Sequence, residues 1–392
     1  MTFIADRLKK IKPSMTVGIN IKANALRAEG KDVLVLAAGE PDFDTPINIR
    51  KAASKAMDDG QTRYVPGKGT PALQKAIQSK FLKDNNLHYD LDEIIVGVGG
   101  KHIIYNAMMA TINPNDEVII PAPFWVSYPD IVLLAEGKPI IVQCPESQNF
   151  KITADQLEKN ITDKTKWLML NSPSNPTGSL YSREELKELA EVLLKYPKVL
   201  IMSDDIYEKV IYDNLKFSTI ASVEPKLKDR CLTLNGVSKA YSMTGWRIGY
   251  AAGNKEVIKK MKTLQSQSTS CASSISQAAA CAALSSECKE LPAMTAEYKK
   301  RHDYVVGQLN KIPGVTCKET DGTFYVFPSF IKYIENSKTI GNDSDLALYL
   351  LNVAKVATVP GSAFGTKGHI RISIAIDISS LEEAMKRISE SL

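Results

Sequence analysis

Short apolar runs alternate with amphipathic stretches from Leu91 to Gly236, and this alternation restricts the fold more than any other feature of the sequence. The runs are rich in Ile, Val and Leu, as expected of buried strands, whereas the stretch 182–195 repeats apolar residues at helical spacing. We predict strands at 93–96, 118–120, 139–142, 167–170, 199–202 and 230–236. Strands that alternate with helices form a mainly parallel sheet with helices on both faces, so the predicted class is α/β.

A second, smaller domain is predicted from the two ends of the chain. A long helical stretch at 255–304 carries the chain away from the sheet, and strand candidates follow at 324–327, 356–359 and 369–373 before a last helix at 381–392. Residues 1–28 form an amphipathic helical lead with a break at Pro13, followed by a strand at 33–37. We predict a large domain over 46–285 and a small α/β domain made of 1–45 and 286–392.

Composition excludes several classes of protein. Of the 392 residues, 44% are hydrophobic and 24% charged, which is ordinary for a globular protein. The net charge of +5 is mild and no Lys/Arg run is dense, so we expect no nucleic-acid partner. No apolar stretch is long enough to span a bilayer, and residues 1–12 lack a signal-peptide core. Six cysteines without C-x-x-C pairs and four histidines without metal-ligand spacing favour a cytoplasmic protein with reduced thiols and no metal site.

Lys239 lies in the most informative motif, the segment 236–249 with the sequence GVSKAYSMTGWRIG. A lysine among small residues at the end of a buried strand is well placed to form a Schiff base with an aldehyde cofactor. Eight residues on, Arg247 offers a planar fork of donors suited to a phosphate. A lone Ser-Lys pair is usually a solvated turn. The full pattern G-x-S-K-x-x-x-x-T-G-x-R-x-G, however, resembles the lysine motif of class I aminotransferases, enzymes that depend on pyridoxal phosphate (PLP). The resemblance implies the fold type I of PLP-dependent transferases.

Gly99, Gly100 and Lys101 form a candidate phosphate cradle between a predicted strand and a predicted helix. Backbone N–H groups at the start of a helix can face an anion. Glycines after a strand more often only make a tight turn. In the family the equivalent turn holds the cofactor phosphate, and the resemblance joins Ser238 and Arg247 to it.

The cofactor ring has candidate partners that each follow a predicted strand. Trp125 lies in a Pro-rich loop, and an aromatic face over a flat ring contributes dispersion and orientation, although a core tryptophan gives the same pattern. The resemblance implies that Asn175 and Tyr207 donate to the phenolic oxygen of the ring. It also implies that Asp204 pairs with the ring nitrogen and keeps it protonated, so that the ring acts as an electron sink. Helix capping is the alternative role for an acidic residue here. The implied catalytic residues are Lys239, Asp204 and Tyr207.

Arg371 is the candidate anchor for the substrate. It lies among apolar residues on a predicted strand, where an unpaired charge would be costly to bury. A bidentate pair with a substrate α-carboxylate accounts for it, and the matching family arginine has this role. The resemblance adds the backbone of Gly39, and also Trp125 and Asn175, to the substrate-binding residues.

Tyr64 lies in the loop 63–69, which is rich in Gly and Pro. From the residues alone it is an ordinary loop aromatic. The resemblance implies that Tyr64 reaches the cofactor phosphate of a neighbouring subunit, so that a homodimer shares its active sites across the interface.

The matches run from Gly39 to Arg371 in the order that the family uses. The phrases KPS at 12–14, AGEPDFD at 38–44 and MTGWR at 243–247 are similar to bacterial aspartate aminotransferases of the subgroup that includes aspartate/prephenate aminotransferases. The resemblance implies amino transfer between aspartate, or glutamate, and 2-oxo acids such as 2-oxoglutarate, with prephenate as a further substrate. An aromatic or broad-specificity aminotransferase and a PLP-dependent lyase are alternatives on the same fold.

A dicarboxylic substrate needs a second cation for its distal carboxylate. Some members of the subgroup use a lysine in the first helix after the phosphate cradle, where this chain has Met109. Lys12 matches a position linked in the subgroup to prephenate use and is the candidate second cation. A solvated charge at a helix end is the alternative for Lys12.

Overall fold

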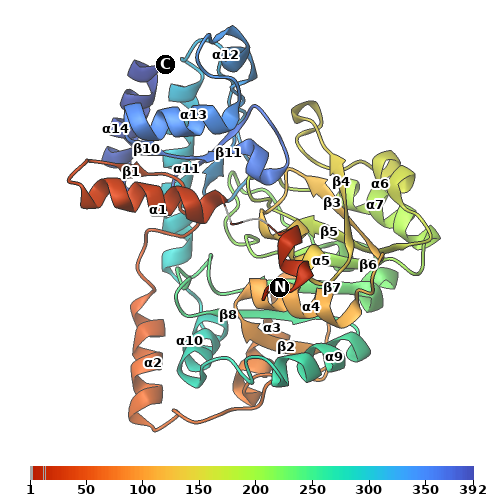
Figure 1. Cartoon of the computed structure of the whole chain (residues 1–392). Helices are drawn as coiled ribbons and strands as arrows, with labels where there is room; N and C mark the ends of the chain where they lie inside the picture. The colour runs from red at the N-terminus through yellow and green to blue at the C-terminus, as the bar shows by residue number, and fades with distance from the viewer. Residues whose placement is uncertain (1–2, 12, 14) are drawn as a thin grey trace.

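A seven-stranded sheet forms the centre of the molecule in the computed structural model, which describes residues 3–11, 13 and 15–392 (Figure 1). The strand order is β2-β8-β7-β6-β5-β3-β4. The strands are β2 (Ile94–Val98), β3 (Glu117–Ala122), β4 (Lys138–Gln143), β5 (Thr165–Asn171), β6 (Leu200–Asp204), β7 (Cys231–Gly236) and β8 (Ile248–Ala252). β8 is antiparallel to both of its neighbours and the other pairs are parallel. The predicted mainly parallel sheet is confirmed.

Strand β8 is missing from the prediction. It contains Gly249 and begins inside the lysine motif, so its strand signal is weak. The glycine is required, because a Cβ there would collide with the backbone of Gly99 and Gly100. This close approach brings Arg247, the residue before β8, to the predicted phosphate cradle.

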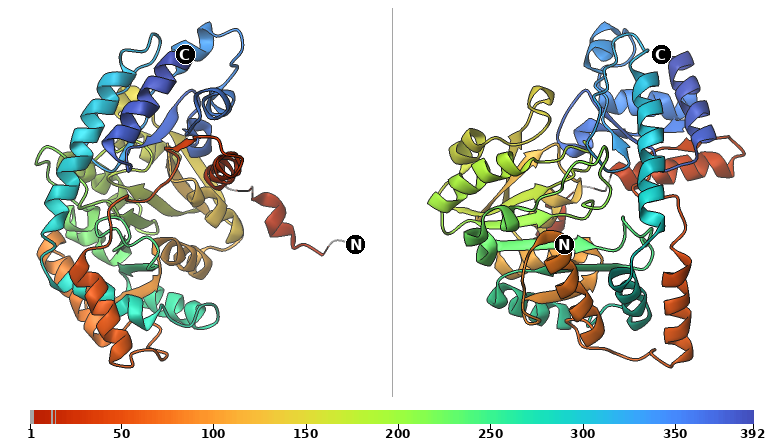
Figure 2. Two further views of the ribbon diagram at one scale, coloured as in Figure 1. Left: turned by 90° about the vertical axis from the view of Figure 1, so that its left-hand side faces the viewer. Right: turned by 180° about the vertical axis from the view of Figure 1, so that it is seen from behind.

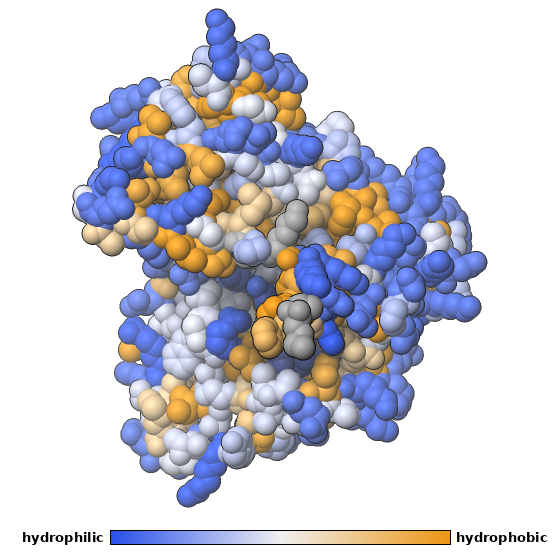
Figure 3. Space-filling model, in the orientation of Figure 1, coloured by the Kyte–Doolittle hydropathy of each residue, from blue (hydrophilic) through white to orange (hydrophobic). Residues whose placement is uncertain are grey.

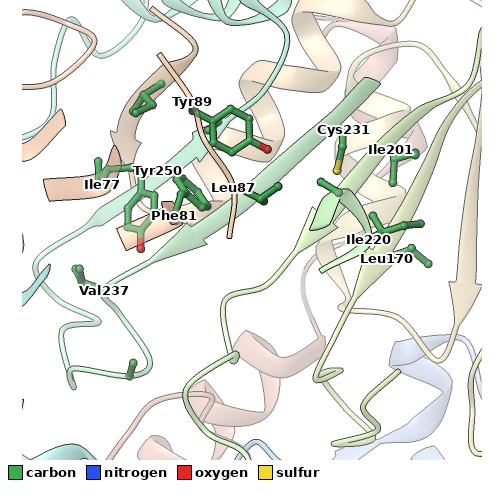
Figure 4. Packing of buried hydrophobic residues seen from close by; sticks show 14 of the residues in the cluster. Ile77, Phe81, Leu87, Tyr89, Leu170, Ile201, Ile220, Cys231, Val237 and Tyr250 are labelled. Carbon is green, nitrogen blue, oxygen red and sulfur yellow. The ribbon is translucent and has the colours of Figure 1, made fainter. Parts of the chain in front are cut away.

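Helices cover both faces of the sheet, as predicted. Alternate strand residues face opposite sides: Ile94 and Val96 belong to one apolar cluster and Ile95 belongs to the other. The first cluster includes residues of α2 (Ile47–Asp58), α3 (Pro71–Asn85), α6 (Ala154–Asn160), α7 (Arg183–Lys195), α8 (Ile220–Val223) and α10 (Ser274–Ser285). The second includes residues of α4 (Gly100–Thr111), α5 (Ser127–Leu134) and α9 (Lys255–Ser266). Figure 4 shows part of the first cluster, where Phe81 packs edge-on against Tyr89 and Tyr250.

Segments from the two ends of the chain pack together beside the sheet, as the red and blue ribbons of Figure 1 show. β1 (Leu34–Val35) pairs in parallel with β10 (Val356–Ala357). β12 (Ile370–Ser373) lies between β11 (Val359–Pro360) and β9 (Tyr325–Val326), and both pairs are antiparallel. The surrounding helices are α1 (Met15–Ala28), α11 (Glu290–Leu309), α12 (Ile331–Asn336), α13 (Asp343–Tyr349) and α14 (Ile378–Ser391). The exact domain boundaries at 45/46 and 285/286 stay a prediction.

The long helical stretch predicted at 255–304 is three helices, α9, α10 and α11. Asn254 and Ser273 accept hydrogen bonds from backbone N–H groups at the starts of α9 and α10, so side-chain caps mark where the helices restart. The predicted strand at 356–359 is likewise divided into β10 and β11.

Short helical turns complete the chain: the 3₁₀ helices η1 (Asp6–Lys10), η2 (Glu146–Gln148), η3 (Pro225–Arg230) and η5 (Gly361–Phe364), and the π-helix η4 (Leu350–Ala354). The side view in Figure 2 shows η1 projecting from the body of the molecule. Within the described residues, every helix is too short or too polar to cross a bilayer.

Candidate active site

A cavity of about 390 Å³ lies at the carboxyl edge of the large sheet, against the segments from the chain ends. Figure 3 shows the surface hollowed between the part that carries α1 and the part that carries the sheet. Eleven predicted site residues line this cavity: Gly39, Gly100, Lys101, Trp125, Asn175, Asp204, Tyr207, Ser238, Lys239, Arg247 and Arg371. Ligands of open α/β sheets bind at this edge, because loops from several parallel strands meet there.

Asp204 is the last residue of β6 and is 5% exposed. Its Oδ2 atom accepts a 2.6 Å hydrogen bond from the Tyr128 hydroxyl, and its Oδ1 atom accepts a longer one, 3.3 Å, from the Ile206 N–H. Burial raises the pKa of Asp204 to about 6, while the hydrogen bond from Tyr128 acts in the opposite direction. The site therefore holds a carboxylate that is ionised at neutral pH inside a buried environment.

Lys239 follows β7 and is partly buried. Its Nζ atom donates a 2.5 Å hydrogen bond to the Gly39 carbonyl oxygen, which ties the lysine to the N-terminal segment. Burial and the positive charges of Arg371 and Arg247 lower the pKa of Lys239 to about 8. An amine with this pKa has a substantial neutral fraction near pH 7, as a nucleophile or a base requires.

Arg371 extends from β12 into the cavity and is 2% exposed. Its Nη1 atom donates to Asn175 Oδ1 at 3.0 Å and its Nη2 atom donates to the Ala37 carbonyl at 2.7 Å. The Nε atom has no hydrogen-bond partner among the described residues, and no carboxylate there pairs with the guanidinium. Burial lowers the pKa of Arg371. A buried cation with only neutral partners is suited to an anionic ligand.

Tyr207 and Tyr325 form a buried pair of phenols whose hydroxyl oxygens lie 3.0 Å apart. Burial raises the pKa of Tyr207 well above its ordinary value, so the group stays a hydrogen-bond donor. A Cβ at Gly39 would lie 2.9 Å from the Tyr325 hydroxyl, so this phenol also limits the residue that fits beside Lys239.

The predicted phosphate cradle is built by the start of α4 and by Arg247. Gly99 precedes the helix with a φ of +81°, and a Cβ there would collide with the guanidinium of Arg247. The backbone of Arg247 also has a left-handed conformation, with a φ of +56°, and its Nη1 atom donates to the Thr244 carbonyl at 2.9 Å. Gly99 does not line the cavity, yet it lets the guanidinium lie at the helix N-terminus, where an anion is favoured.

Trp125 and Lys101 lie together on one wall of the cavity. The Lys101 Nζ atom is 4.8 Å from the centre of the indole ring. Burial and the charge of Arg247 lower the pKa of Lys101. Met109 lies in the same helix, packs against the apolar cluster of that face, and is not among the lining residues.

Of the remaining predicted site residues besides Gly99, Tyr64 lies away from this cavity. Tyr64 is 92% exposed and borders a separate surface pocket with residues of α10. Lys12 lies outside the described residues, so the structure does not test it. In the described part of the chain, no three His, Cys, Asp or Glu side chains are grouped to hold a metal ion.

Three further residues, Tyr128, Tyr325 and Asn171, line the cavity without having been predicted as site residues. Asn171 ends β5 directly opposite Asp204 at the end of β6, and its side chain donates to the Asp204 carbonyl oxygen at 2.8 Å. A polar residue that closes an apolar run was the available signal for Asn171. The two tyrosines gave no such signal, because each lies in a segment of apolar and aromatic residues.

Known proteins share this fold and cover the same length of chain. Residues 31–388 match the family described as "Aminotransferase class I and II". A protein named "Probable aspartate/prephenate aminotransferase" from Rickettsia bellii (strain RML369-C) is 51% identical over 395 residues, which cover 100% of this chain and 99% of that protein. The crystal structure of the aspartate aminotransferase from Rhizobium meliloti has a TM-score of 0.96 at 49% identity, covering 100% of this chain and 99% of that one. The Thermus thermophilus aspartate aminotransferase with maleate has a TM-score of 0.93 at 37% identity, with 100% of both chains covered. The chain belongs to the class I and II aminotransferase family.

Proposed function

We propose that this chain transfers an amino group between aspartate, or glutamate, and 2-oxo acids such as 2-oxoglutarate, with PLP held at Lys239. One observation carries the proposal: a lysine amine with a lowered pKa shares a cavity with a buried arginine, Arg371, whose partners among the described residues are all neutral. An amino-acid substrate offers an amine for the first group and an α-carboxylate for the second.

The donor set of the cavity fits PLP, the cofactor that class I aminotransferases use. Arg247 and the backbone amides at the start of α4 would hold its phosphate. Trp125 would stack on the ring and Asp204 would pair with the ring nitrogen. Asn175 accepts from Arg371 through its amide oxygen, so its Nδ2 group would donate to the phenolic oxygen together with Tyr207. The lining residues therefore fit a ligand that combines a flat ring with an anionic group, and PLP is such a ligand.

When bound, PLP supplies an electron sink that stabilises negative charge on the substrate Cα. Arg371 would fix the substrate carboxylate, and the freed Lys239 Nζ would take the proton from Cα and return one in the reverse half-reaction. With a pKa of about 8, roughly one lysine in ten is neutral at pH 7. The neutral fraction of an ordinary lysine side chain is far smaller at that pH.

Among the described residues, Lys101 is the cation that best suits a distal carboxylate, and Lys12 stays the candidate that the resemblance implies. It lines the cavity beside Trp125, and its lowered pKa still leaves it able to bind an anion when protonated. Met109 lies eight residues further along α4, about 12 Å away along the helix axis. With Lys101 in this role, a dicarboxylic substrate would need no lysine at position 109. The relatives named for aspartate, and the relative with maleate, support the same substrate class.

An amino-donor panel tests the proposal. The purified chain is incubated with aspartate, glutamate and aromatic amino acids against 2-oxoglutarate, oxaloacetate and prephenate. We expect glutamate and oxaloacetate from aspartate and 2-oxoglutarate, and the relatives named for prephenate make it the second acceptor to measure. Release of ammonia and fumarate from aspartate, or of alanine and carbon dioxide, would instead identify a lyase. A preference for aromatic donors over aspartate would overturn the aspartate assignment.

We also propose that the active unit is a homodimer in which Tyr64 completes the partner's site. Tyr64 is exposed and lies off its own cavity, and Phe3, Leu8 and Ile21 are further large exposed apolar side chains. Mixing a Lys239→Ala chain with a Tyr64→Ala chain tests this sharing. Hybrid dimers would carry one fully native site, so activity should return to about a quarter of the wild-type level. No recovery after subunit exchange would contradict a shared site.

A further inference from the structure

Tyr128 contributes a short hydrogen bond to the buried carboxylate of the site. It is the second residue of α5 and is 2% exposed. Its hydroxyl donates to Asp204 Oδ2 at 2.6 Å, whereas the bond from the Ile206 N–H to Oδ1 is stretched to 3.3 Å. Among the described residues no other side chain donates to this carboxylate. The orientation of Asp204 therefore depends mainly on Tyr128.

The same tyrosine also contacts the wall of the cavity that carries Trp125. The two rings meet edge to face, with centroids 5.5 Å apart and an interplanar angle of 83°. This geometry fixes the tilt of the indole, because aromatic pairs favour such T-shaped contacts. One side chain thus supports both the group proposed to stack on the cofactor ring and the group proposed to meet its nitrogen.

We propose that Tyr128 is a positioning residue for the reaction. Its hydroxyl keeps the Asp204 carboxylate ionised and oriented toward the ring nitrogen of the cofactor. The inference rests on the proposed function, which gives Asp204 that partner. A carboxylate that is protonated, or turned away, could not keep the ring nitrogen protonated, and the electron sink would be weakened.

The electrostatics of the site agree with this role. Burial raises the pKa of Asp204 to about 6; the Tyr128 hydrogen bond and the charge of Lys239 lower it. Tyr207 and Asp205 are the other titratable groups near the pair, and burial raises the pKa of each well above its ordinary value. The pKa of Tyr128 is raised as well, chiefly by burial, so the phenol keeps its proton and remains a donor. Without that donor, burial would act on Asp204 with less opposition.

The test measures how tightly the full-length apo-protein binds pyridoxamine 5′-phosphate, a ligand with the same ring nitrogen that forms no imine with Lys239. Dissociation constants are taken from quenching of tryptophan fluorescence between pH 5.5 and 8.5. In Tyr128→Phe the ring is kept and only the hydroxyl is lost. We expect the variant-to-wild-type ratio of dissociation constants to rise about tenfold as the pH falls, which corresponds to an Asp204 pKa about one unit higher. A ratio that is the same at every pH would mean that Tyr128 acts only through packing, and would overturn the inference.

Three comparisons make the outcome specific. Tyr181→Phe removes another buried hydroxyl, which accepts from the Ile152 N–H outside the main cavity, and should leave the ratio near one at every pH. In an Asp204→Asn background, adding Tyr128→Phe should change the dissociation constant by the same factor at every pH. A ligand analogue with carbon in place of the ring nitrogen should bind wild type and Tyr128→Phe with a pH-independent ratio.

The failures of the two proposals are distinguishable. If Asp204→Asn binds pyridoxamine 5′-phosphate as tightly as wild type at every pH, the assignment of Asp204 to the ring nitrogen is wrong and the inference about Tyr128 falls with it, whereas the proposed amino transfer is overturned only by the donor panel. If Asp204→Asn weakens binding but Tyr128→Phe gives a constant ratio, only the inference about Tyr128 falls. Should Tyr128→Phe not fold, a fluorinated tyrosine at position 128 is a stronger donor of nearly unchanged shape. It should extend tight binding to lower pH, and an unchanged pH profile would contradict the inference.

Discussion

Two buried arginines, Arg301 and Arg371, have nearly the same surroundings but opposite partners. They are 5% and 2% exposed, and each guanidinium lies over two aromatic rings, at 5.3 and 5.8 Å for Arg301 and at 4.5 and 4.9 Å for Arg371. Arg301 pairs with both oxygens of Asp42 at 2.9 Å and with Glu297 at 3.0 Å. Within the described part of the chain, Arg371 bonds only to an amide oxygen and a backbone carbonyl.

The charge of the partners distinguishes a structural cation, Arg301, from a cation that is suited to bind a ligand, Arg371. A buried charge whose counter-ion is in the chain contributes to holding segments together, and Arg301 joins α11 to Asp42, three residues after Gly39. A buried charge without a counter-ion is costly to the folded state unless a ligand supplies one. Burial alone does not distinguish the two arginines, whereas the charge of their partners does.

The largest expected effect comes from removing the cation that has no counter-ion. Arg371→Leu should lower kcat/KM for aspartate about 10³-fold, or ~4 kcal/mol, because two charge-assisted hydrogen bonds to the substrate carboxylate are lost. The free energy of unfolding should stay the same or rise, since an apolar side chain replaces an unpaired buried charge. Steady-state kinetics and urea unfolding of the same preparation measure both. A variant that is strongly destabilised but fully active would reverse the comparison.

Arg301→Leu should give the opposite pattern. It leaves Asp42 and Glu297 without their cation, and breaking a buried pair costs about 3 kcal/mol or more of stability. We expect a clear fall in the urea midpoint, with kcat/KM per folded molecule reduced far less than in Arg371→Leu. Equal losses of activity in the two variants would show that Arg301 also acts on the site, through the Gly39 segment.

A smaller effect is expected for Lys101, which lines the cavity in the first turn of α4. Lys101→Ala should raise KM for aspartate about tenfold, as expected for the loss of one partly solvated ion pair. The KM for an amino acid with an uncharged side chain should change little. Met109→Ala is the matched control from the same helix, because Met109 packs against the apolar cluster. Equal changes for charged and uncharged donors would exclude Lys101 as the second cation.

The two arginines also illustrate which features of the site can be predicted from the sequence. The alternation of strands and helices predicts the sheet, and the fold brings to one cavity eleven of the residues that the motifs and the family resemblance indicated. Arg371 was recognisable because a strand of apolar residues gives an arginine no other reason to be there. Arg301 was not singled out, since its pairing with Asp42 joins residues 259 positions apart.

Other features of the site depend on contacts that the sequence does not encode locally. Strand β8 was missed because its glycine is required by backbone packing against α4, which no strand propensity reflects. Tyr128 and Tyr325 look like core aromatics until their hydroxyls are seen to meet Asp204 and Tyr207. Long-range polar contacts of this kind come only from the folded chain.

The smallest expected effect links the two arginines to the lysine. The charge of Arg371 is, after burial, the next cause that lowers the pKa of Lys239 to about 8, whereas Arg301 is not among the causes. Arg371→Leu should therefore move the Lys239 pKa upward, toward the ordinary value of a lysine, and Arg301→Leu should leave it in place. Because only the neutral amine reacts, the rate of reductive methylation of Lys239 in the apo-protein should rise through a midpoint near pH 8 in wild type and through a higher one in Arg371→Leu. The same midpoint in all three proteins would mean that burial alone sets the pKa of Lys239, and that the two buried arginines differ in substrate binding but not in how they act on the amine.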